Sequence, residues 1–262
     1  SFYKKINESI DKNGLRGNFN NGVKLSRAML KFGIDLRRKL FSDIHEQFGG
    51  RLRKLVCGGA PIRPEIGRFF EDIGISLING YGITECSPLV SANWDKFNDP
   101  ATVGFNLPCI DMRIDAPTPE GIGEICVRGD VVMLGYYKDP EQTGAVMRDG
   151  WFYTGDYGMI NKYGQLVITG RKKNIIVLSN GKNIYPEEIE ALVARLPYVT
   201  DVIVRADKNE HGEQSSLTAE IFCADGFGER SERNILTEIR RECSELPSYK
   251  IPSKLSVRTE PF

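Results

Sequence analysis

The chain has 262 residues, 40% of them hydrophobic and 27% charged, with a formal net charge of zero, so it can form one large domain or two modest ones and has no bulk attraction to nucleic acid. Its six cysteines include no CxxC pair and it has only two histidines, which argues against a zinc site and a disulfide scaffold and favours a reducing, cytoplasmic compartment. No apolar run is long enough to span a bilayer as a helix, and no signal peptide is recognisable.

The first 54 residues are strongly basic. They carry 13 Lys and Arg against 5 Asp and Glu, a net charge of +8 that the remainder of the chain offsets. Residues 1–22 are polar and indicate no clear element, whereas an approximate apolar stripe over residues 23–48 predicts a helix with a break near Gly33. Two interpretations stay open: a solvated helix face, which is the commoner case, or peripheral contact with an anionic membrane surface.

A strand, a helix and a second strand are predicted over residues 52–57, 64–73 and 75–78. A unit of this kind pairs its two strands in parallel. Ligands of open parallel sheets bind beyond the carboxyl ends of the strands. Two glycine-rich segments stand there, Gly58-Gly59-Ala60-Pro61 and Asn79-Gly80-Tyr81-Gly82, and we expect both to be turns.

Three side chains with useful chemistry follow in Tyr81-Gly82-Ile83-Thr84-Glu85. The ring of Tyr81 offers a flat face on which a base can stack. The hydroxyl of Thr84 can bond a phosphate oxygen, and the carboxylate of Glu85 is a hard oxygen ligand suited to Mg²⁺. A turn with a helix-capping Thr84 would explain the same residues without a ligand, so these residues alone leave both interpretations open.

Residues 100–169 consist of short strand-like runs between Gly and Pro turns, which predicts a small barrel or a twisted antiparallel sheet. Asp156, in an expected turn after Gly155, could accept two hydrogen bonds from the cis-diol of a ribose, or could satisfy its own backbone as many turn aspartates do. Arg171 lies 15 residues downstream. A hairpin between the two would bring Arg171 back beside Asp156, where it could bond ribose or phosphate, or form a surface ion pair of small energetic value.

Residues 174–262 read as a compact α+β unit. Pro186 opens a helix, and the acids in its first turn, Glu187 among them, suit the helix dipole. Strands over residues 199–205, 217–223 and 254–258 and a helix over residues 231–246 complete the unit. The predicted fold class is therefore α/β: a partial large domain, made of a parallel βαβ unit and a small barrel-like subdomain, followed by a small α+β C-terminal domain.

Five motifs, taken in order, resemble the adenylate-forming (AMP-binding) superfamily of acyl-CoA synthetases, peptide-synthetase adenylation domains and luciferases. They are Gly58-Gly59-Ala60-Pro61, Tyr81-Gly82-Ile83-Thr84-Glu85, Gly123-Glu124-Ile125 with Gly135-Tyr136-Tyr137, Tyr153-Thr154-Gly155-Asp156, and Gly170-Arg171-Lys172-Lys173. The run from Gly170 to Pro186 looks most like long-chain fatty acid CoA ligases. The resemblance covers residues 50–262, and the motifs of phosphate-loop, dinucleotide-binding, serine-hydrolase and zinc-protease proteins are missing from the sequence.

The resemblance implies a reaction and a role for each motif. A fatty acid and ATP give an acyl-adenylate and pyrophosphate, and the thiol of coenzyme A then displaces AMP. Thr84 and Glu85 would be the catalytic pair, with Thr84 at the phosphate and Glu85 binding Mg²⁺. Asp156 and Arg171 would hold the ribose, Lys173 would be the hinge residue, and Gly181 would line the path of pantetheine. The residues that would hold adenine are Gly58, Gly59, Ala60, Pro61, Asn79, Gly80, Tyr81 and Gly82.

The same resemblance implies a domain plan. Residues 1–170 would be the C-terminal part of the large AMP-binding domain, residues 171–174 a hinge, and residues 175–262 a truncated small domain. The superfamily's own Ser/Thr/Gly-rich phosphate loop is expected before Ser1, and its adenylation lysine beyond Phe262. The resemblance therefore predicts that this chain is the C-terminal half of a larger enzyme and is inactive by itself. Two alternatives stay open: another adenylate-forming enzyme, such as an aryl-CoA ligase or a peptide-synthetase adenylation domain, and a catalytically inactive nucleotide-binding fragment. Acyl chain length and oligomeric state are left open.

Overall fold

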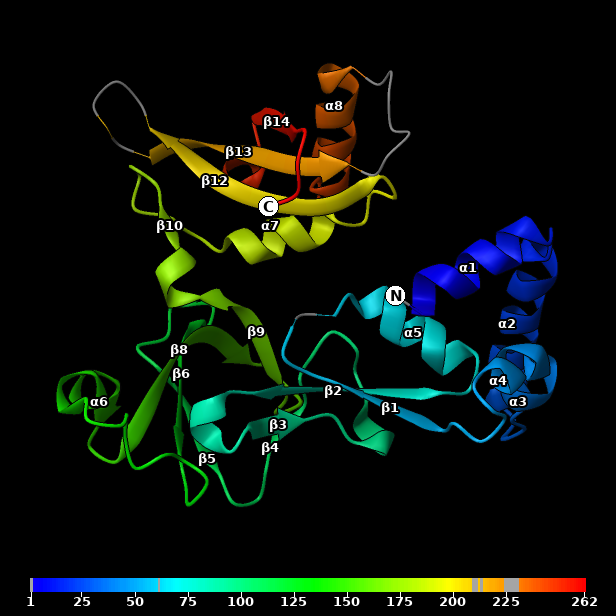
Figure 1. The fold of residues 1–262 in the computed structure, drawn as a ribbon, viewed down its shortest axis with the longest axis horizontal. Coiled ribbons are helices and arrows are strands. Elements are labelled where there is room, and N and C mark those ends of the chain that lie inside the picture. Colours follow the sequence, from blue (N-terminus) through cyan, green and yellow to red (C-terminus); the bar gives the residue numbers. More distant parts are fainter. Residues whose placement is uncertain (1, 61, 209–211, 213, 224–230) are drawn as a thin grey trace. The chain divides into compact units, whose positions relative to one another are not determined.

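A computed structural model describes residues 2–60, 62–208, 212, 214–223 and 231–262. The chain divides into two compact units, whose helices and strands are labelled in Figure 1. Unit 1 takes the residues up to Met112 together with Val127–Phe152 and Ile160–Val167. Unit 2 takes Arg113–Cys126, Tyr153–Met159 and Ile168–Phe262. The hinge expected at residues 171–174 stays a prediction.

Unit 1 opens with helices that begin well before the one broken helix predicted over residues 23–48. They are α1 (Phe2–Lys12), α2 (Arg16–Leu30), α3 (Arg37–Leu40) and α4 (Ser42–Gln47). The break falls where expected, since Gly33 has a φ of 77°, a conformation that favours glycine. The polar opening residues form α1 because Ile6 and Ile10, one helical turn apart, bury the same face against a core that includes Phe41.

The predicted βαβ unit is confirmed: β1 (Lys54–Cys57) and β2 (Ser76–Gly82) pair in parallel, with α5 (Pro64–Asp72) between them in the chain. One expectation is wrong, because β2 runs on through residues 79–82, which we expected to be a turn. The extra length pairs antiparallel with β3 (Leu89–Ala92), and β3 pairs with β4 (Phe105–Asn106), so the sheet has the order β1-β2-β3-β4.

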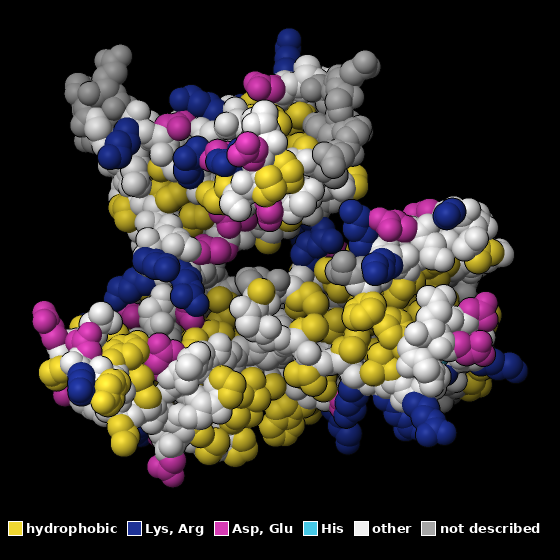
Figure 2. All heavy atoms as spheres, in the orientation of Figure 1, with side chains coloured by type: hydrophobic (Ala, Val, Ile, Leu, Met, Phe, Trp, Pro, Cys, Tyr) yellow, Lys and Arg dark blue, Asp and Glu magenta, His cyan; other side chains and the backbone are white. Residues whose placement is uncertain are grey.

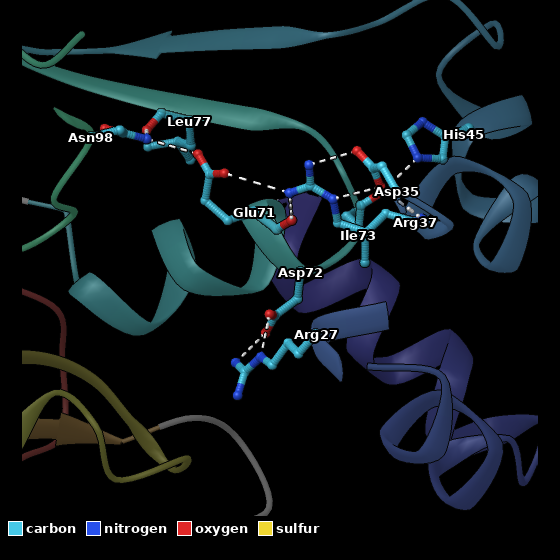
Figure 3. A network of polar contacts seen from close by, with 9 residues as sticks. All are labelled: Arg27, Asp35, Arg37, His45, Glu71, Asp72, Ile73, Leu77 and Asn98. Atoms are coloured by element: carbon cyan, nitrogen blue, oxygen red, sulfur yellow. Dashed lines mark hydrogen bonds and ion pairs between the residues drawn. The ribbon is translucent and has the colours of Figure 1, made fainter. Parts of the chain in front are cut away.

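Cationic side chains from the preceding helices hold the carboxyl end of α5 (Figure 3). Arg37 donates from Nη1 to the Glu71 carbonyl oxygen at 2.9 Å and also bonds the Asp35 carboxylate. Arg27 bonds both oxygens of Asp72 at 2.7 Å. Positive charge at a helix carboxyl end complements the helix dipole. The network further includes His45, Ile73, Leu77 and Asn98.

The middle of the chain forms an open sheet. Among the described residues its strands follow the order β5-β6-β8-β7, with β9 also paired to β8, and no pairing closes them into a barrel. Of the two predicted alternatives, the small barrel is therefore wrong, and the sheet is the one that fits. The strands are β5 (Asp111–Asp115), β6 (Gly123–Arg128), β7 (Met147–Arg148), β8 (Trp151–Ile160) and β9 (Leu166–Arg171), and α6 (Pro140–Val146) precedes β7.

Residues 172–262 confirm the predicted α+β arrangement. In the three-stranded sheet, β12 (Val199–Lys208) pairs antiparallel with β13 (Gln214–Cys223), and β13 pairs in parallel with β14 (Lys254–Arg258). Helices α7 (Pro186–Val193) and α8 (Glu232–Glu242) contact each other and pack on this sheet. Their core residues Ile189 and Ile239 are fully buried. The hairpin of β10 (Ile176–Val177) and β11 (Asn183–Ile184) lies between η3 (Lys172–Asn174) and α7, and η4 (Ser248–Lys250) precedes β14.

Candidate functional site

The carboxyl ends of β1 and β2 approach each other closely in unit 1. Cys57 pairs with Asn79, and a Cβ added to Gly58 would lie 3.3 Å from the Gly80 carbonyl oxygen. Glycine therefore permits the close approach of the two backbones. Of the expected adenine residues that follow β1, Gly58, Gly59 and Ala60 are exposed, and Pro61 lies outside the described residues.

A buried polar cluster, formed by Asn79, Asn93, Thr102 and Gln165, includes one residue of β2, Asn79. Asn79 and Asn93 both donate to the Thr102 carbonyl oxygen, at 3.2 and 2.9 Å, and the Thr102 hydroxyl donates to Asn93 Oδ1 at 3.1 Å. Gln165 donates to Asn93 Oδ1 and to the Phe97 carbonyl oxygen. The side chain of Asn79 is thus engaged with the protein, and the cluster fixes β2 just before Tyr81, whose side chain is half-buried.

The chain turns sharply after β2. A Cβ on Gly82 would lie 2.2 Å from the Pro88 carbonyl oxygen, and Ile83 N donates to that same oxygen at 2.7 Å. The short helix η1 (Thr84–Cys86) follows, with Ile83 as its N-cap and no side-chain capping bond. The helix-cap explanation of Thr84 is therefore wrong, and its side chain is exposed.

Glu85 is half-buried and is held by the segment of residues 129–137. The Tyr136 hydroxyl donates to Glu85 Oε1 at 2.9 Å, and Met133 N donates to the Glu85 carbonyl oxygen at 2.8 Å. Burial and this hydrogen bond raise the pKa of Tyr136, so the hydroxyl keeps its proton and remains a donor at neutral pH. Burial, with the nearby Glu85 charge, raises the pKa of Cys86 to about 11, so this thiol is not an activated nucleophile.

Asp156 and Arg171 meet in unit 2, as the hairpin predicted. Arg171 Nε lies 3.2 Å from Asp156 Oδ1, and the side chains are 58% and 6% exposed respectively. Asp156 lies within β8 rather than in the turn expected, although Gly155 before it has a φ of 71°. The turn that reverses the chain from β8 to β9 is closed by Asn161 N donating to the Gln165 carbonyl oxygen.

Glu124 is a buried carboxylate beside these residues for which the sequence predicted no role. Its Oε1 accepts from Gly155 N at 3.2 Å, and its Oε2 lies 2.5 Å from Lys172 Nζ. The neighbouring Thr154 hydroxyl donates to the Ile125 carbonyl oxygen at 2.8 Å. Glu124 therefore links Gly155, the residue of β8 before Asp156, to the segment expected to be the hinge. Its only sequence signal was its place in the Gly123-Glu124-Ile125 motif.

Lys173 is exposed within η3. Glu187 of α7 braces this segment, since its Oε1 accepts from Asn174 Nδ2 at 2.6 Å and from Arg171 N at 3.3 Å. Glu187 thus does more than complement the dipole of its own helix, the one role the sequence predicted. Gly181 lies at the exposed tip of the β10–β11 hairpin with a φ of 76°.

Comparison with known proteins gives consistent matches. Residues 23–137 match the family of AMP-binding enzymes. A long-chain-fatty-acid–CoA ligase of Yersinia pestis is 36% identical over 216 residues, which are 80% of this chain and 37% of that protein. Among solved structures, ATP-bound MatB of Rhodopseudomonas palustris is 29% identical with a TM-score of 0.69, covering 82% of this chain and 43% of that one. The amide bond synthetase McbA of Marinactinospora thermotolerans is 26% identical with a TM-score of 0.65, covering 80% and 43%. The chain spans less than half the length of each of these proteins.

Proposed function

We propose that this chain, which belongs through residues 23–137 to the AMP-binding enzyme family, has a specific function within it. In this proposal the chain forms the nucleotide-handling part of an AMP-forming long-chain fatty acid CoA ligase. A carboxylate oxygen of the fatty acid attacks the α-phosphorus of ATP and pyrophosphate leaves. The sulfur of coenzyme A then attacks the acyl carbon, AMP leaves with the electron pair of the broken bond, and the thiol proton is released. The Yersinia pestis relative, named for a long-chain fatty acid and CoA, supports this choice of substrates.

The observation that carries the proposal is the pair of Asp156 and Arg171. A carboxylate that is 6% exposed beside a guanidinium that is 58% exposed gives an acceptor of fixed position and a donor that can move. Vicinal hydroxyls suit this pair, because a carboxylate can accept two hydrogen bonds from a diol while an arginine donates to nearby oxygens. In this proposal Asp156 and Arg171 hold the ribose of the nucleotide.

The proposal gives the residues around β2 the remaining parts of the nucleotide. The glycine-rich ends of β1 and β2 hold adenine with Tyr81 stacking on it, and the exposed Thr84 hydroxyl donates to a phosphate oxygen. Lys173 is the residue about which the C-terminal part turns between the two half-reactions. Gly181 lines the path of the pantetheine arm of coenzyme A.

Glu85 is the proposed Mg²⁺ ligand. The described part of the chain contains no group of three or more His, Cys, Asp or Glu residues that could hold a metal ion. A single carboxylate fits Mg²⁺ nonetheless, because this ion commonly combines one or two carboxylates with substrate phosphates and water. When bound, the ion neutralises phosphate charge during group transfer.

Nucleotide binding is tested by calorimetry with AMP and 2′-deoxy-AMP. Wild-type protein should prefer AMP by about tenfold, the value of a hydrogen bond to a charged acceptor. Asp156→Ala should abolish the preference, while Asp201→Ala, an exposed position in the same unit, should preserve it. A wild-type protein that binds both nucleotides equally would refute the ribose assignment, and one that binds neither would refute the nucleotide site.

The acid is tested by pyrophosphate exchange with the complete natural protein and a panel of acids. A long-chain fatty acid should stimulate exchange most. The competing candidate is another adenylate-forming enzyme, favoured by the likeness to an amide bond synthetase. Stimulation by an aryl or amino acid with none by any fatty acid would decide for that candidate.

Contact of the N-terminal helices with an anionic membrane is a secondary proposal, as is a cytoplasmic location. Phe32 is 80% exposed and stands beside Lys31, an arrangement that suits a membrane interface. Acidic side chains are interspersed with the basic ones over α1–α4 (Figure 2), and Arg27 and Arg37 are paired with acids. In the described residues no helix has both the length and the apolar character needed to cross a membrane. Flotation with anionic vesicles should lift the wild-type protein and leave Phe32→Ser behind.

A further inference from the structure

Tyr136 belongs to the Gly135-Tyr136-Tyr137 motif, for which the proposed function provides no task. Its hydroxyl lies 2.9 Å from Glu85 Oε1, although the two residues are 51 positions apart in the chain. Tyr136 is half-buried, whereas its neighbour Tyr137 is 88% exposed. One tyrosine of the motif thus points at the proposed metal ligand and the other at solvent.

The start of α6 holds the backbone of Tyr136 in place. Tyr136 N donates to the Thr143 hydroxyl oxygen at 2.9 Å, and that hydroxyl donates to the Asp139 carbonyl oxygen at 2.7 Å. Asp139 in turn caps the helix by accepting from Gln142 N. A Cβ on Gly135 would lie 2.8 Å from Thr143 Cγ2, so the preceding position requires glycine. Tyr136 therefore presents its hydroxyl from a braced segment.

The hydroxyl is not needed to fix this segment to η1. Met133 N donates to the Glu85 carbonyl oxygen at 2.8 Å, and the Ser87 hydroxyl donates to the Val131 carbonyl oxygen at 2.9 Å. Both bonds would remain in a chain that lacks the Tyr136 hydroxyl. The bond from Tyr136 is instead the one that acts on the carboxylate itself.

We propose that Tyr136 is a positioning residue, whose hydroxyl orients the Glu85 carboxylate for the Mg²⁺ of Mg·ATP. A donor on one carboxylate oxygen restricts rotation of the group and sets the direction of the other oxygen. Hydrogen bonds that orient metal ligands in this way typically change metal affinity by tenfold or more. This inference rests on the proposed function, which makes Glu85 the metal ligand.

The test uses Tyr136→Phe, which removes one oxygen atom, and Tyr137→Phe as the matched control. Binding of Mn²⁺ in the presence of ATP is followed by electron paramagnetic resonance, and binding of AMP without metal by calorimetry. Tyr136→Phe should weaken Mn·ATP binding about tenfold and leave AMP binding unchanged. Tyr137→Phe should change neither. Glu85→Gln should weaken Mn·ATP binding at least as much, and adding Tyr136→Phe to it should have no further effect.

The outcomes separate the inference from the proposed function. Wild-type affinity for Mn·ATP in Tyr136→Phe overturns the inference and leaves the nucleotide site standing. An equal loss of AMP and Mn·ATP binding shows that the hydroxyl maintains the fold, which also overturns it. A wild-type protein that binds neither nucleotide removes the proposed function and the inference with it. If Tyr136→Phe does not fold, Thr143→Val should give a smaller loss of Mn·ATP affinity with AMP binding intact, and unchanged Mn·ATP affinity in that variant overturns the inference.

Discussion

Arg27 and Arg37 both contact the carboxyl end of α5 and each makes a 2.7 Å ion pair, Arg27 with Asp72 and Arg37 with Asp35 (Figure 3). Their removal should nevertheless have different costs. The Arg37 side chain is 22% exposed and donates to the backbone carbonyl oxygen of Glu71. A charged donor on such an acceptor contributes about 1.5–3 kcal/mol, and its loss leaves the carbonyl without that partner. The Arg27 side chain is 59% exposed, and exposed pairs contribute about 0–1 kcal/mol.

Methionine is the substitution to use at both positions, because it retains most of the aliphatic stem and removes the charge. Arg37→Met should lower the free energy of unfolding by about 2–3 kcal/mol, and Arg27→Met by less than half as much. Both tryptophans of the chain, Trp94 and Trp151, lie in unit 1, so their fluorescence in urea reports the part of the molecule that contains α5. With a slope of about 2 kcal/mol per molar urea, the Arg37→Met midpoint should fall by about 1 M.

The pH dependence provides a second check on Arg37. Its hydrogen bond to Asp35 holds the pKa of that carboxyl below its ordinary value. A carboxyl with a depressed folded-state pKa contributes stability above its unfolded pKa and loses that contribution as the pH falls through the folded value. The difference between wild type and Arg37→Met should therefore narrow in acid, below about pH 4. Equal costs for the two arginine variants at neutral pH would refute the reasoning.

Three further outcomes are expected. Gly82→Ala should lower stability by about 1–3 kcal/mol or more, because its Cβ would lie 2.2 Å from the Pro88 carbonyl oxygen. The control Gly144→Ala, in an open helical position, should leave the melting temperature followed by fluorescence unchanged or raise it. A larger fall in melting temperature for Gly144→Ala than for Gly82→Ala would count against the backbone clash. Burial raises the pKa of Cys243 to about 11 from an ordinary value near 9. Between pH 9 and 11 the folded state therefore keeps a proton that the unfolded state loses, and stability should fall over this range by up to about 2–3 kcal/mol. Cys243→Ala should flatten that fall in urea titrations followed by circular dichroism, and an unchanged dependence of stability on pH would contradict the burial argument. Iodoacetamide followed by mass spectrometry should label the exposed Cys109 well before the buried Cys243, and equal rates would show that the buried thiol opens to solvent.

The sequence correctly predicted those helices and strands whose ends are determined by the residues at the ends themselves. Pro186 occupies the first turn of α7 as its fixed φ requires, and β14 has the predicted bounds, Lys254–Arg258. The glycines of Asn79–Gly82 predicted a turn, but pairing with β3 extends the strand through them. These residues form a strand in spite of their turn propensity, because β3 supplies strand-pairing partners that the sequence around residues 79–82 does not reveal.

The same distinction applies to the candidate site, where contacts within one hairpin were predictable and contacts between distant segments were not. The meeting of Asp156 and Arg171 was predictable, because one hairpin connects them. The bond between Tyr136 and Glu85 was not predictable, because a polar contact across 51 residues leaves no periodic pattern in the sequence. Glu124 was hidden for the same reason, since both its partners come from later segments of the chain.

The buried polar cluster that includes Asn79 also determines where this chain can change its length. Asn93, Thr102 and Gln165 meet only if the loop between the first two has its present number of residues, and Leu166 fixes the register by exchanging backbone hydrogen bonds with Val103 and Gly104. An insertion in residues 94–101 would leave several buried polar groups without partners. Residues 119 and 120 form an exposed turn, and the half-buried Gly121 that follows has open space around an added Cβ. Natural length variation, or a grafted peptide tag, should therefore be accepted at residues 119–121 and rejected at residues 94–101.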